Sequence, residues 1–305
     1  MTAHMRARLL ILCPGQGGQH AAMFDLARSD ARAAALLERL NVRLEPETLF
    51  TNRAAQPLVV AASLAMWEAI RGFAPAPALV AGYSVGELSA YGVAGALTAE
   101  QAVALAATRA ALMDACVEIR PGQALAAISG LAPARVRALI GDDNFMVAIE
   151  NGEDGCIVGG PADGLEALAA RIAAAGARLA RLPVEVASHT PYMTAAVAPF
   201  AAALGACAFQ PQRIPVLSGI AACKVEGKAA AVEHLSRQLA EKIVWMDCMD
   251  ACAEAGITVA LELGPGAALA RMLQARHPAI ACRSMADFRT VDGIRQWLQR
   301  QAKLA

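Results

Sequence analysis

The chain has 305 residues, a formal net charge of zero at pH 7, and 57% hydrophobic residues with only 4% aromatic ones. That length allows one large domain or two smaller ones, and the alanine-rich composition indicates helices packed tightly on a sheet. The balanced charge argues against nucleic acid as a general partner, and no apolar run reaches the ~20 residues of a membrane span. Because the segment before the first strand pattern lacks a small-residue cleavage site, we expect no signal peptide and a soluble, cytoplasmic protein.

Strand-like and amphipathic segments alternate along the N-terminal part of the chain, which is the pattern of an α/β fold. The first strand ends in a glycine-rich segment, Pro14 to Gln19, and Thr98 with Glu100 marks the start of a later helix. The predicted elements are a strand at 8–13, a helix at 51–70, a strand at 79–83, a helix at 86–94 and a helix at 99–116.

Pro121-Gly122 interrupts that pattern, and shorter elements follow in the order β-α-β-β-α-β. This order is the ferredoxin-like arrangement, so we predict a small inserted subdomain over residues 122–185. Its elements are strands at 125–129, 147–150, 156–159 and 178–184 and helices at 133–140 and 162–175. After it we expect a helix up to 204, a strand at 214–217, a helix at 232–239 and a strand at 259–263.

The most informative motif lies at residues 79–89, where Ser84 follows a short buried strand and precedes a helix. Gly82 and Gly86 flank it and complete the G-x-S-x-G nucleophile elbow. A tight strand-to-helix turn exposes the hydroxyl, and side chains at the glycine positions would collide with the neighbouring strand and helix. The alternative is a structural glycine-rich turn, but the position between strand and helix favours an exposed nucleophile.

A serine nucleophile needs a base within hydrogen-bond reach, and histidine is the usual one. Of the five histidines, His189 stands between a strand and a helix, where a loop residue can face a cleft. His20, which follows the glycine-rich segment, is the second candidate.

The eight cysteines form no C-x-x-C pair and no disulfide spacing. Cys248 and Cys252 lie one helical turn apart but have no histidine at ligand spacing, so we predict no metal site and free thiols instead. The glycine-rich segment at 14–19 lacks the Lys-Ser/Thr that follows a phosphate-binding loop.

Seven separated motifs occur in the order found in one enzyme family. Together they resemble the malonyl-CoA:acyl-carrier-protein transacylases, which include the acyltransferase domains of fatty-acid and polyketide synthases, from about residue 8 to residue 275. The motifs are Pro14-Gly-Gln-Gly17, Ala55-Gln-Pro57, Gly82-Tyr-Ser-Val-Gly-Glu87, Arg109 with Met113, Ser188-His189, Arg237-Gln-Leu239 and Glu262-Leu-Gly-Pro-Gly266.

Within that family the chain looks most like the epsilon subunit of malonate decarboxylase. The features that indicate this are Leu49-Phe-Thr-Asn-Arg-Ala-Ala-Gln-Pro57, Tyr83 before the nucleophile, and Arg283-Ser-Met-Ala-Asp-Phe-Arg289 with Trp297. The resemblance implies an α/β-hydrolase-like core, residues 1–121 and 186–305, around the small subdomain, with the site in the cleft between them.

The resemblance also implies a role for each site residue. Ser84 attacks the malonyl thioester, and His189 takes the serine proton and returns it to the departing thiol. The main-chain carbonyl of Gln238 orients the imidazole in place of an acid. The backbone N–H groups of Gln16 and Val85 hold the oxyanion. The donor is malonyl-CoA, the acceptor is a phosphopantetheine-type thiol of an acyl-carrier protein, and no cofactor is permanently bound.

Arg109 is the residue that the resemblance assigns to substrate choice. On its own, an arginine in this apolar stretch reads as a surface charge on a helix. The family pairs it with the free carboxylate of malonate. Tyr83 and Gly18 depart from the histidine and serine that most relatives carry there, which leaves acceptor and acyl preference open.

From residue 270 onward the chain carries seven Lys or Arg and only two acids, Asp287 and Asp292. A basic surface attracts an acidic carrier protein, so we expect carrier docking at Arg271 and Arg276, the alternative being a solvated tail. Expected partners are an acyl-carrier protein and other malonate decarboxylase subunits, with no nucleic acid and no membrane. Three alternatives stay open: a transacylase of fatty-acid or polyketide synthesis, a serine esterase or thioesterase, and a non-catalytic binding subunit.

Overall fold

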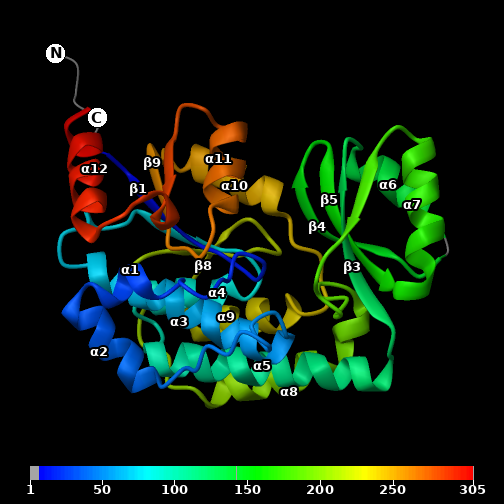
Figure 1. Cartoon of the computed structure of the whole chain (residues 1–305), viewed down its shortest axis with the longest axis horizontal. Helices are drawn as coiled ribbons and strands as arrows, with labels where there is room; N and C mark the ends of the chain where they lie inside the picture. The colour runs from blue at the N-terminus through cyan, green and yellow to red at the C-terminus, as the bar shows by residue number, and fades with distance from the viewer. Residues whose placement is uncertain (1–6, 142, 305) are drawn as a thin grey trace.

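The computed structural model describes residues 7–141 and 143–304, which form two sheets with helices packed around them (Figure 1). The larger sheet has the strand order β10-β9-β1-β2-β7-β8, parallel except for β8. Its strands are β1 (Leu9–Cys13), β2 (Leu79–Gly82), β7 (Val216–Leu217), β8 (Lys224–Val225), β9 (Val259–Glu262) and β10 (Ala281–Ser284).

Helices cover both faces of this sheet, which explains why β1, β2 and β9 are buried along their whole length and, apart from Glu262 at the end of β9, are apolar. Successive side chains of a strand point to opposite faces. Leu9 and Ile11 of β1 therefore join the core under α3, α5 and α8, whereas Leu10 and Leu12 join the core under α10 and α11. The helices are α1 (Asp25–Arg28), α2 (Ala31–Leu40), α3 (Asn52–Ile70), α4 (Gly86–Val93), α5 (Ala99–Ile119), α8 (Thr194–Ala206), α9 (Gly227–Arg237), α10 (Trp245–Glu254), α11 (Ala268–Arg276) and α12 (Val291–Leu304).

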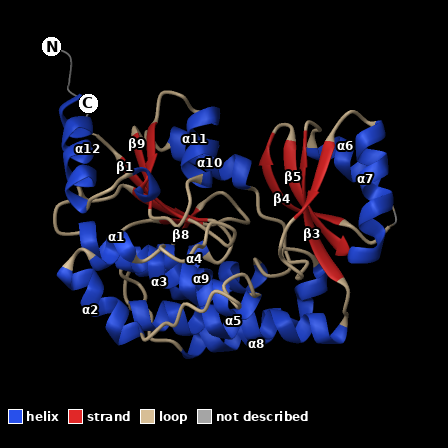
Figure 2. Ribbon diagram, viewed as in Figure 1, coloured by secondary structure: helices blue, strands red, loops and turns tan. Residues whose placement is uncertain are grey.

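The smaller sheet is antiparallel, with the strand order β4-β5-β3-β6, and its two helices lie on one face, away from the larger sheet (Figure 2). Its elements in chain order are β3 (Gln123–Ser129), α6 (Pro133–Ile140), β4 (Met146–Gly152), β5 (Gly155–Pro161), α7 (Leu165–Ala174) and β6 (Arg178–Arg181). The fold prediction, an α/β-hydrolase-like core with a ferredoxin-like subdomain, is confirmed. The boundaries at 122 and 185 stay a prediction.

Two strands are substantially shorter than predicted, and each is shortened next to a proline. The strand expected over 178–184 ends at Arg181, because Pro183 has no N–H to continue the ladder. The strand expected over 214–217 is reduced to Val216 and Leu217, directly after Pro215. In the described part of the chain, no helix is long and apolar enough to cross a membrane.

Backbone pairing joins the smaller sheet to the segment around Ile243, between α9 and α10. The Glu150 N–H donates to the Ile243 carbonyl at 2.9 Å, and the Ile243 N–H donates to the Ala148 carbonyl at 3.0 Å. Strand β4 is thereby fixed to the segment that precedes α10. This junction holds the small subdomain beside the carboxyl ends of β1 and β2, where ligand sites of α/β folds form.

Candidate active site

Ser84 lies on the turn between β2 and α4 with a backbone φ of 55°, in the left-handed region that residues other than glycine rarely adopt. The turn is tight enough to need its glycines. A Cβ on Gly82 would lie 2.3 Å from the Glu87 nitrogen, and one on Gly86 would lie 2.2 Å from the Cys13 carbonyl oxygen. The strained turn holds the Ser84 side chain in one place at the end of the strand.

The structure brings Ser84 and His189 together, although they are 105 residues apart in the chain. Ser84 Oγ lies 2.8 Å from His189 Nε2, and His189 Nδ1 lies 2.6 Å from the main-chain oxygen of Gln238. Because a carbonyl can only accept, Nδ1 carries the proton and the Nε2 lone pair faces the serine hydroxyl. His20, the second candidate, is exposed and lines a separate cavity of about 390 Å³.

The surroundings of His189 keep the imidazole neutral. Burial lowers its pKa to about 3, and the positive charge of Arg109 acts in the same direction, while the hydrogen bond to the Gln238 carbonyl opposes them. A neutral imidazole is the form that accepts a proton from a hydroxyl. This arrangement is compatible with the predicted roles of Ser84 as nucleophile and His189 as base.

The guanidinium of Arg109 is buried beside the nucleophile, with only 1% of the residue exposed. Nη2 lies 3.4 Å from Ser84 Oγ and 3.4 Å from Gln238 Oε1. Nη1 donates to Gln56 Oε1 at 2.7 Å and lies 3.3 Å from Met113 Sδ. Neutral acceptors thus surround a buried cation next to the reacting oxygen, which suits an acyl group that carries a carboxylate.

Gln56 is held in place by a chain of hydrogen bonds that leads away from the nucleophile. Its Nε2 donates to Asn52 Oδ1 at 2.6 Å, and Asn52 Nδ2 donates to Asp114 Oδ1 at 2.8 Å. This arrangement fixes the amide of Gln56 with its oxygen toward Arg109. Asn52 and Asp114 also line a groove of about 960 Å³ near Val186.

The glycine-rich segment 14–19 lies against the elbow. The Tyr83 N–H donates to the Cys13 carbonyl at 2.9 Å, and a Cβ on Gly15 would lie 3.6 Å from the Ser84 Cβ. The backbone N–H groups of Gln16 and Val85 donate no hydrogen bond to the other residues that the structure describes. Their assignment to the oxyanion hole stays a prediction.

Two side chains of the site were given no role from the sequence. Gln238 Nε2 donates to Glu87 Oε2, so the amide of Gln238 connects a buried carboxylate to Arg109 in addition to its main-chain bond with His189. Glu87 also accepts the Gly219 N–H at 3.1 Å and is 1% exposed. A charged residue inside the apolar helix that follows the elbow was the available signal.

Tyr83, the residue before the nucleophile, points to the small subdomain. Its hydroxyl donates to Asn151 Oδ1 of β4 at 3.0 Å, and its ring packs edge-on against Trp245 with centroids 5.2 Å apart. The elbow is therefore tied directly to the second sheet.

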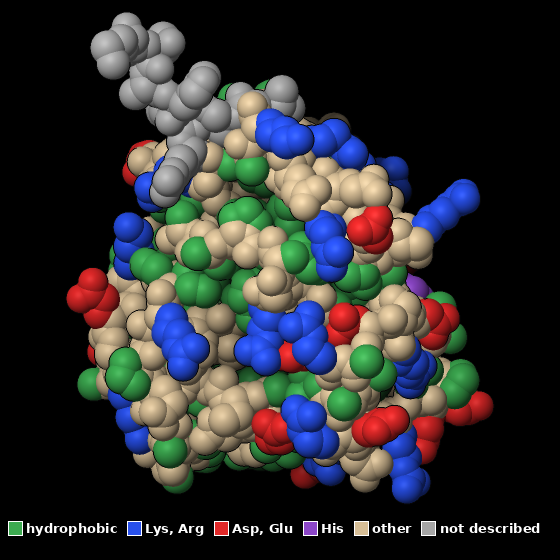
Figure 3. Space-filling model, turned by 90° about the vertical axis from the view of Figure 1, so that its left-hand side faces the viewer, with side chains coloured by type: hydrophobic (Ala, Val, Ile, Leu, Met, Phe, Trp, Pro, Cys, Tyr) green, Lys and Arg blue, Asp and Glu red, His purple; other side chains and the backbone are tan. Residues whose placement is uncertain are grey.

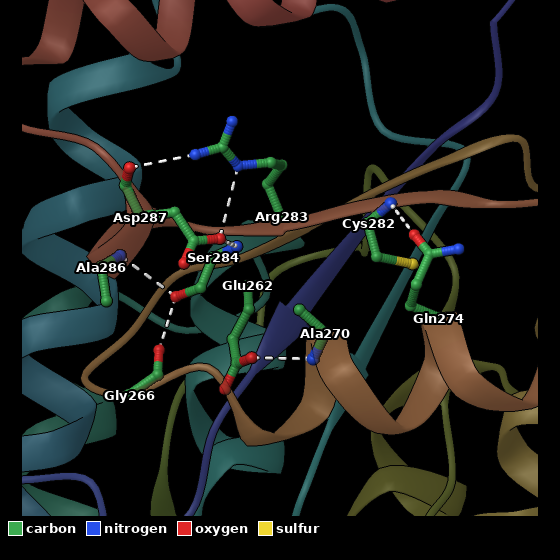
Figure 4. A network of polar contacts seen from close by, with 9 residues as sticks. All are labelled: Glu262, Gly266, Ala270, Gln274, Cys282, Arg283, Ser284, Ala286 and Asp287. Atoms are coloured by element: carbon green, nitrogen blue, oxygen red, sulfur yellow. Dashed lines mark hydrogen bonds and ion pairs between the residues drawn. The ribbon is translucent and has the colours of Figure 1, made fainter. Parts of the chain in front are cut away.

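A polar network behind the glycine-rich segment holds the turn after β9 (Figure 4). Ser284 Oγ donates to the Gly266 carbonyl, and the Ser284 N–H donates to Asp287 Oδ2 at 2.9 Å. Glu262 Oε2 accepts the Ala270 N–H at 2.8 Å, while Glu262 Oε1 has no partner among the described residues.

That turn contacts the glycine-rich segment at Gly18. A Cβ on Gly18 would lie 2.5 Å from the Pro265 carbonyl oxygen, so a serine at this position does not fit this backbone. Gly18 is thereby explained by close packing of two chain segments.

The Ser84–His189 pair has the geometry of a serine acyltransferase or hydrolase site, with a buried cation beside the serine hydroxyl. No cluster of three metal-ligating side chains occurs within the part of the chain that the structure describes. Arg271 and Arg276, the predicted docking residues, lie on α11, and Arg276 pairs with Asp250 and Glu153 and not with a site residue.

Comparison with known proteins places the chain in a family. The model of the acyl transferase domain matches residues 11–281. The chain is 32% identical to the malonyl CoA-acyl carrier protein transacylase of Mycobacterium tuberculosis over 92% of this chain and 97% of that protein. The structure of FabD from Acinetobacter baumannii superposes with a TM-score of 0.89 at 26% identity, covering 99% of this chain and 100% of that one.

A further solved structure, a malonyl-transacylase in complex with its type II polyketide acyl-carrier protein, has a TM-score of 0.86 at 25% identity over 95% of this chain and 99% of that one. The chain belongs to the acyl transferase domain family.

Proposed function

We propose that the chain transfers the malonyl group of malonyl-CoA to the thiol of an acyl-carrier protein through a malonyl-Ser84 intermediate. The observation that carries this is the buried guanidinium of Arg109, 3.4 Å from Ser84 Oγ. With a neutral acyl group, the guanidinium N–H groups would have only neutral hydrogen-bond acceptors, whereas the distal carboxylate of malonate pairs with them directly.

The reaction follows from the positions of the side chains. Ser84 Oγ attacks the thioester carbon while His189 Nε2 takes the hydroxyl proton. The oxyanion is stabilised by the N–H groups of Gln16 and Val85. The tetrahedral intermediate collapses, the C–S bond breaks, and the proton passes from His189 to the CoA sulfur. The carrier thiol then gives its proton to His189 and attacks the carbonyl carbon of malonyl-Ser84. The ester bond to Ser84 breaks, and His189 returns the proton to Ser84 Oγ. The products are malonyl-carrier and free enzyme.

We propose further that the acceptor is the carrier subunit of malonate decarboxylase. Tyr83, the segment 49–57 and the segment 283–289 support this assignment, because they resemble the epsilon subunit of that enzyme. A carrier of fatty-acid or polyketide synthesis is the alternative acceptor. The two acceptors are distinguished by comparing the rate of malonyl transfer to a carrier with a modified dephospho-CoA arm and to a carrier with a phosphopantetheine arm. Faster transfer to the phosphopantetheine carrier contradicts the malonate decarboxylase role.

We propose that the carrier docks near α11. Lys and Arg side chains are spread over the neighbouring face that carries α12 (Figure 3). Arg271 is exposed and has no ion pair among the described residues, whereas Arg276 is paired with Asp250 at 2.6 Å and with Glu153 at 3.6 Å. Arg271 is therefore the cleaner test. Arg271→Glu should weaken transfer to the carrier and lower its salt dependence, with malonyl loading of Ser84 unchanged. Unchanged carrier kinetics would remove the docking site.

The proposed function is tested by incubating the protein with malonyl-CoA or acetyl-CoA, with and without carrier. We expect one malonyl mass on Ser84, none on the Ser84→Ala variant, and malonyl-carrier as the main product. Release of free malonate at the rate of loading would instead identify a hydrolase, and absence of any acyl mass would identify a non-catalytic binding subunit.

A further inference from the structure

Two opposite charges are buried behind the nucleophile, and one glutamine links them. Glu87 and Arg109 are each 1% exposed. Gln238 donates its Nε2 to Glu87 Oε2 and accepts from Arg109 Nη2 on its Oε1 at 3.4 Å. The Glu87 carboxylate can only accept, so the amide nitrogen of Gln238 must face it. The amide oxygen of Gln238 therefore faces the Arg109 guanidinium.

The other groups around Glu87 do not neutralise it. The Gly219 N–H, from the loop between β7 and β8, donates to the same oxygen, and Glu87 Oε1 is without a hydrogen-bond partner among the residues described. The titratable groups that face it are Arg109 on α5, Tyr91 on its own helix α4, and Cys248 on α10. Arg109 is the only cation among them, so each buried charge has the other as its counter-charge.

We propose that Glu87 is the resident counter-ion of Arg109, and that it takes up one proton from solvent when the carboxylate of the acyl substrate binds to Arg109. This inference rests on the proposed function, since it needs a carboxylate-bearing acyl group. Written as a balance, the ionised Glu87, the Arg109 cation and the substrate carboxylate combine with one proton. The product is a protonated Glu87 and a paired Arg109. Glu87 acts through Gln238 and is a positioning residue.

The physical reason is the cost of net charge in a buried site. Before binding, the Arg109 cation and the Glu87 anion balance each other. When a second carboxylate enters, the site would carry an uncompensated negative charge, which is costly at low dielectric. Protonation of Glu87 removes that charge. Burial raises the pKa of Glu87 to about 7, against the opposing effects of Gly219, Gln238 and Arg109, so the exchange falls in the range of ordinary assays.

The sign of the pH effect follows directly. Below the Glu87 pKa the group is already protonated, and binding takes up no proton. Above it, binding of a malonyl group is coupled to uptake of one proton, so KM for malonyl-CoA should rise by about tenfold per pH unit. Acetyl-CoA has no carboxylate, and its KM should show no such slope.

The test uses the Ser84→Ala protein, which binds acyl-CoA without reacting. Titration calorimetry in buffers of different ionisation enthalpy gives the number of protons taken up with malonyl-CoA, minus the number with acetyl-CoA. We expect a difference approaching one proton at about pH 8 and close to zero at about pH 5.5. A difference of zero at both pH values overturns the proposal, and this comparison requires no change at Glu87.

The second arm adds Glu87→Gln, with Glu262→Gln as the matched control. Glu262 is also buried, and burial raises its pKa to about 7, but Arg109 is not among the charges that act on it. The proton difference should vanish in Glu87→Gln and persist in Glu262→Gln. If the proton difference is lost in both variants, or persists in both, a group other than Glu87 takes up the proton.

The two proposals fail in different ways. If the protein with Ser84 intact forms no malonyl-enzyme, the proposed function fails. If the malonyl-enzyme forms but the proton difference is absent, only the counter-ion role of Glu87 fails.

Discussion

His189 Nδ1 lies 2.6 Å from the main-chain oxygen of Gln238, while the side chain of the same glutamine lies 3.4 Å from Arg109. One residue therefore contacts the proposed base with its backbone and the proposed acyl-binding cation with its side chain. Substitutions can separate these two roles, because a side-chain change leaves the carbonyl in the chain.

Gln238→Ala should preserve the base and weaken the fixation of Arg109. We expect kcat/KM for malonyl-CoA to fall by about tenfold, the cost of one hydrogen bond to a charged group, and kcat/KM for acetyl-CoA to change less than about twofold. His189→Ala is the comparison variant, and it should lower kcat/KM for malonyl-CoA and for acetyl-CoA by a factor of about 100 or more. Equal losses for both substrates in Gln238→Ala would show that the side chain has no part in substrate choice.

Arg109→Ala should change acyl selectivity. Removal of the buried guanidinium leaves the malonyl carboxylate without its partner, so malonyl loading should fall by about 100-fold or more. Acetyl loading should fall far less. Arg53→Ala removes an exposed arginine from nearby α3, where it pairs with Asp114 at 3.4 Å, and should leave the malonyl-to-acetyl ratio unaltered. A uniform loss of both activities in Arg109→Ala would contradict the assigned role.

The same variant should shift the pH profile. Burial lowers the pKa of His189, and the positive charge of Arg109 lowers it further by disfavouring the imidazolium. In the wild type, the rate of acetyl loading should therefore stay constant as the pH falls to well below about 6.5, the ordinary pKa of histidine. In Arg109→Ala the His189 pKa should rise, and the acid limb should move to higher pH. A limb at the same pH in both proteins would show that the two groups do not interact.

Tyr83→Phe should loosen the tie between elbow and small subdomain. The ring contact with Trp245 remains, but the hydrogen bond to Asn151 is lost. We expect a decrease of about 1 kcal/mol in the free energy of unfolding. Asn151→Ala and the double variant complete a cycle, in which the two losses should not add. Additive losses, measured by denaturant unfolding, would mean that the hydrogen bond contributes nothing.

The sequence allowed prediction of the elbow because its constraints are local: the turn at Ser84 needs small residues at fixed positions. The alternation of strands and helices likewise predicted the fold class and most of the strands of both sheets, although β8 and β10 were missed. Helix α2 was missed although Asp30 caps it by accepting the Arg32 and Ala33 N–H groups. Strand β8, of two residues, is too short to leave a periodic pattern.

The site was harder to predict, because its residues meet only in the folded chain. Nothing local connects Glu87 with Gln238, which is 151 residues away. A main-chain carbonyl such as that of Gln238 has no side-chain signature at all. Arg109, as a single charge on a helix, reads as solvent-exposed from the sequence, and only the structure shows that it is buried.

Glu262→Gln should gain stability relative to wild type as the pH rises. Burial raises the pKa of Glu262 from 4.5 to about 7, and the Ala270 N–H satisfies only one carboxylate oxygen. Between these two pKa values the folded state binds more protons than the unfolded state. The contribution of Glu262 to stability is therefore fully present below about pH 4.5 and is lost as the pH rises through 7.

A neutral glutamine removes this dependence while its amide oxygen can still accept from Ala270. Relative to wild type, the free energy of unfolding of Glu262→Gln should shift in favour of the variant by at most about 3 kcal/mol between pH 5 and pH 8. Any constant cost of the unpaired amide cancels from this difference. Denaturant unfolding at both pH values measures it, and a difference that does not change with pH would mean that Glu262 is ionised equally in both states.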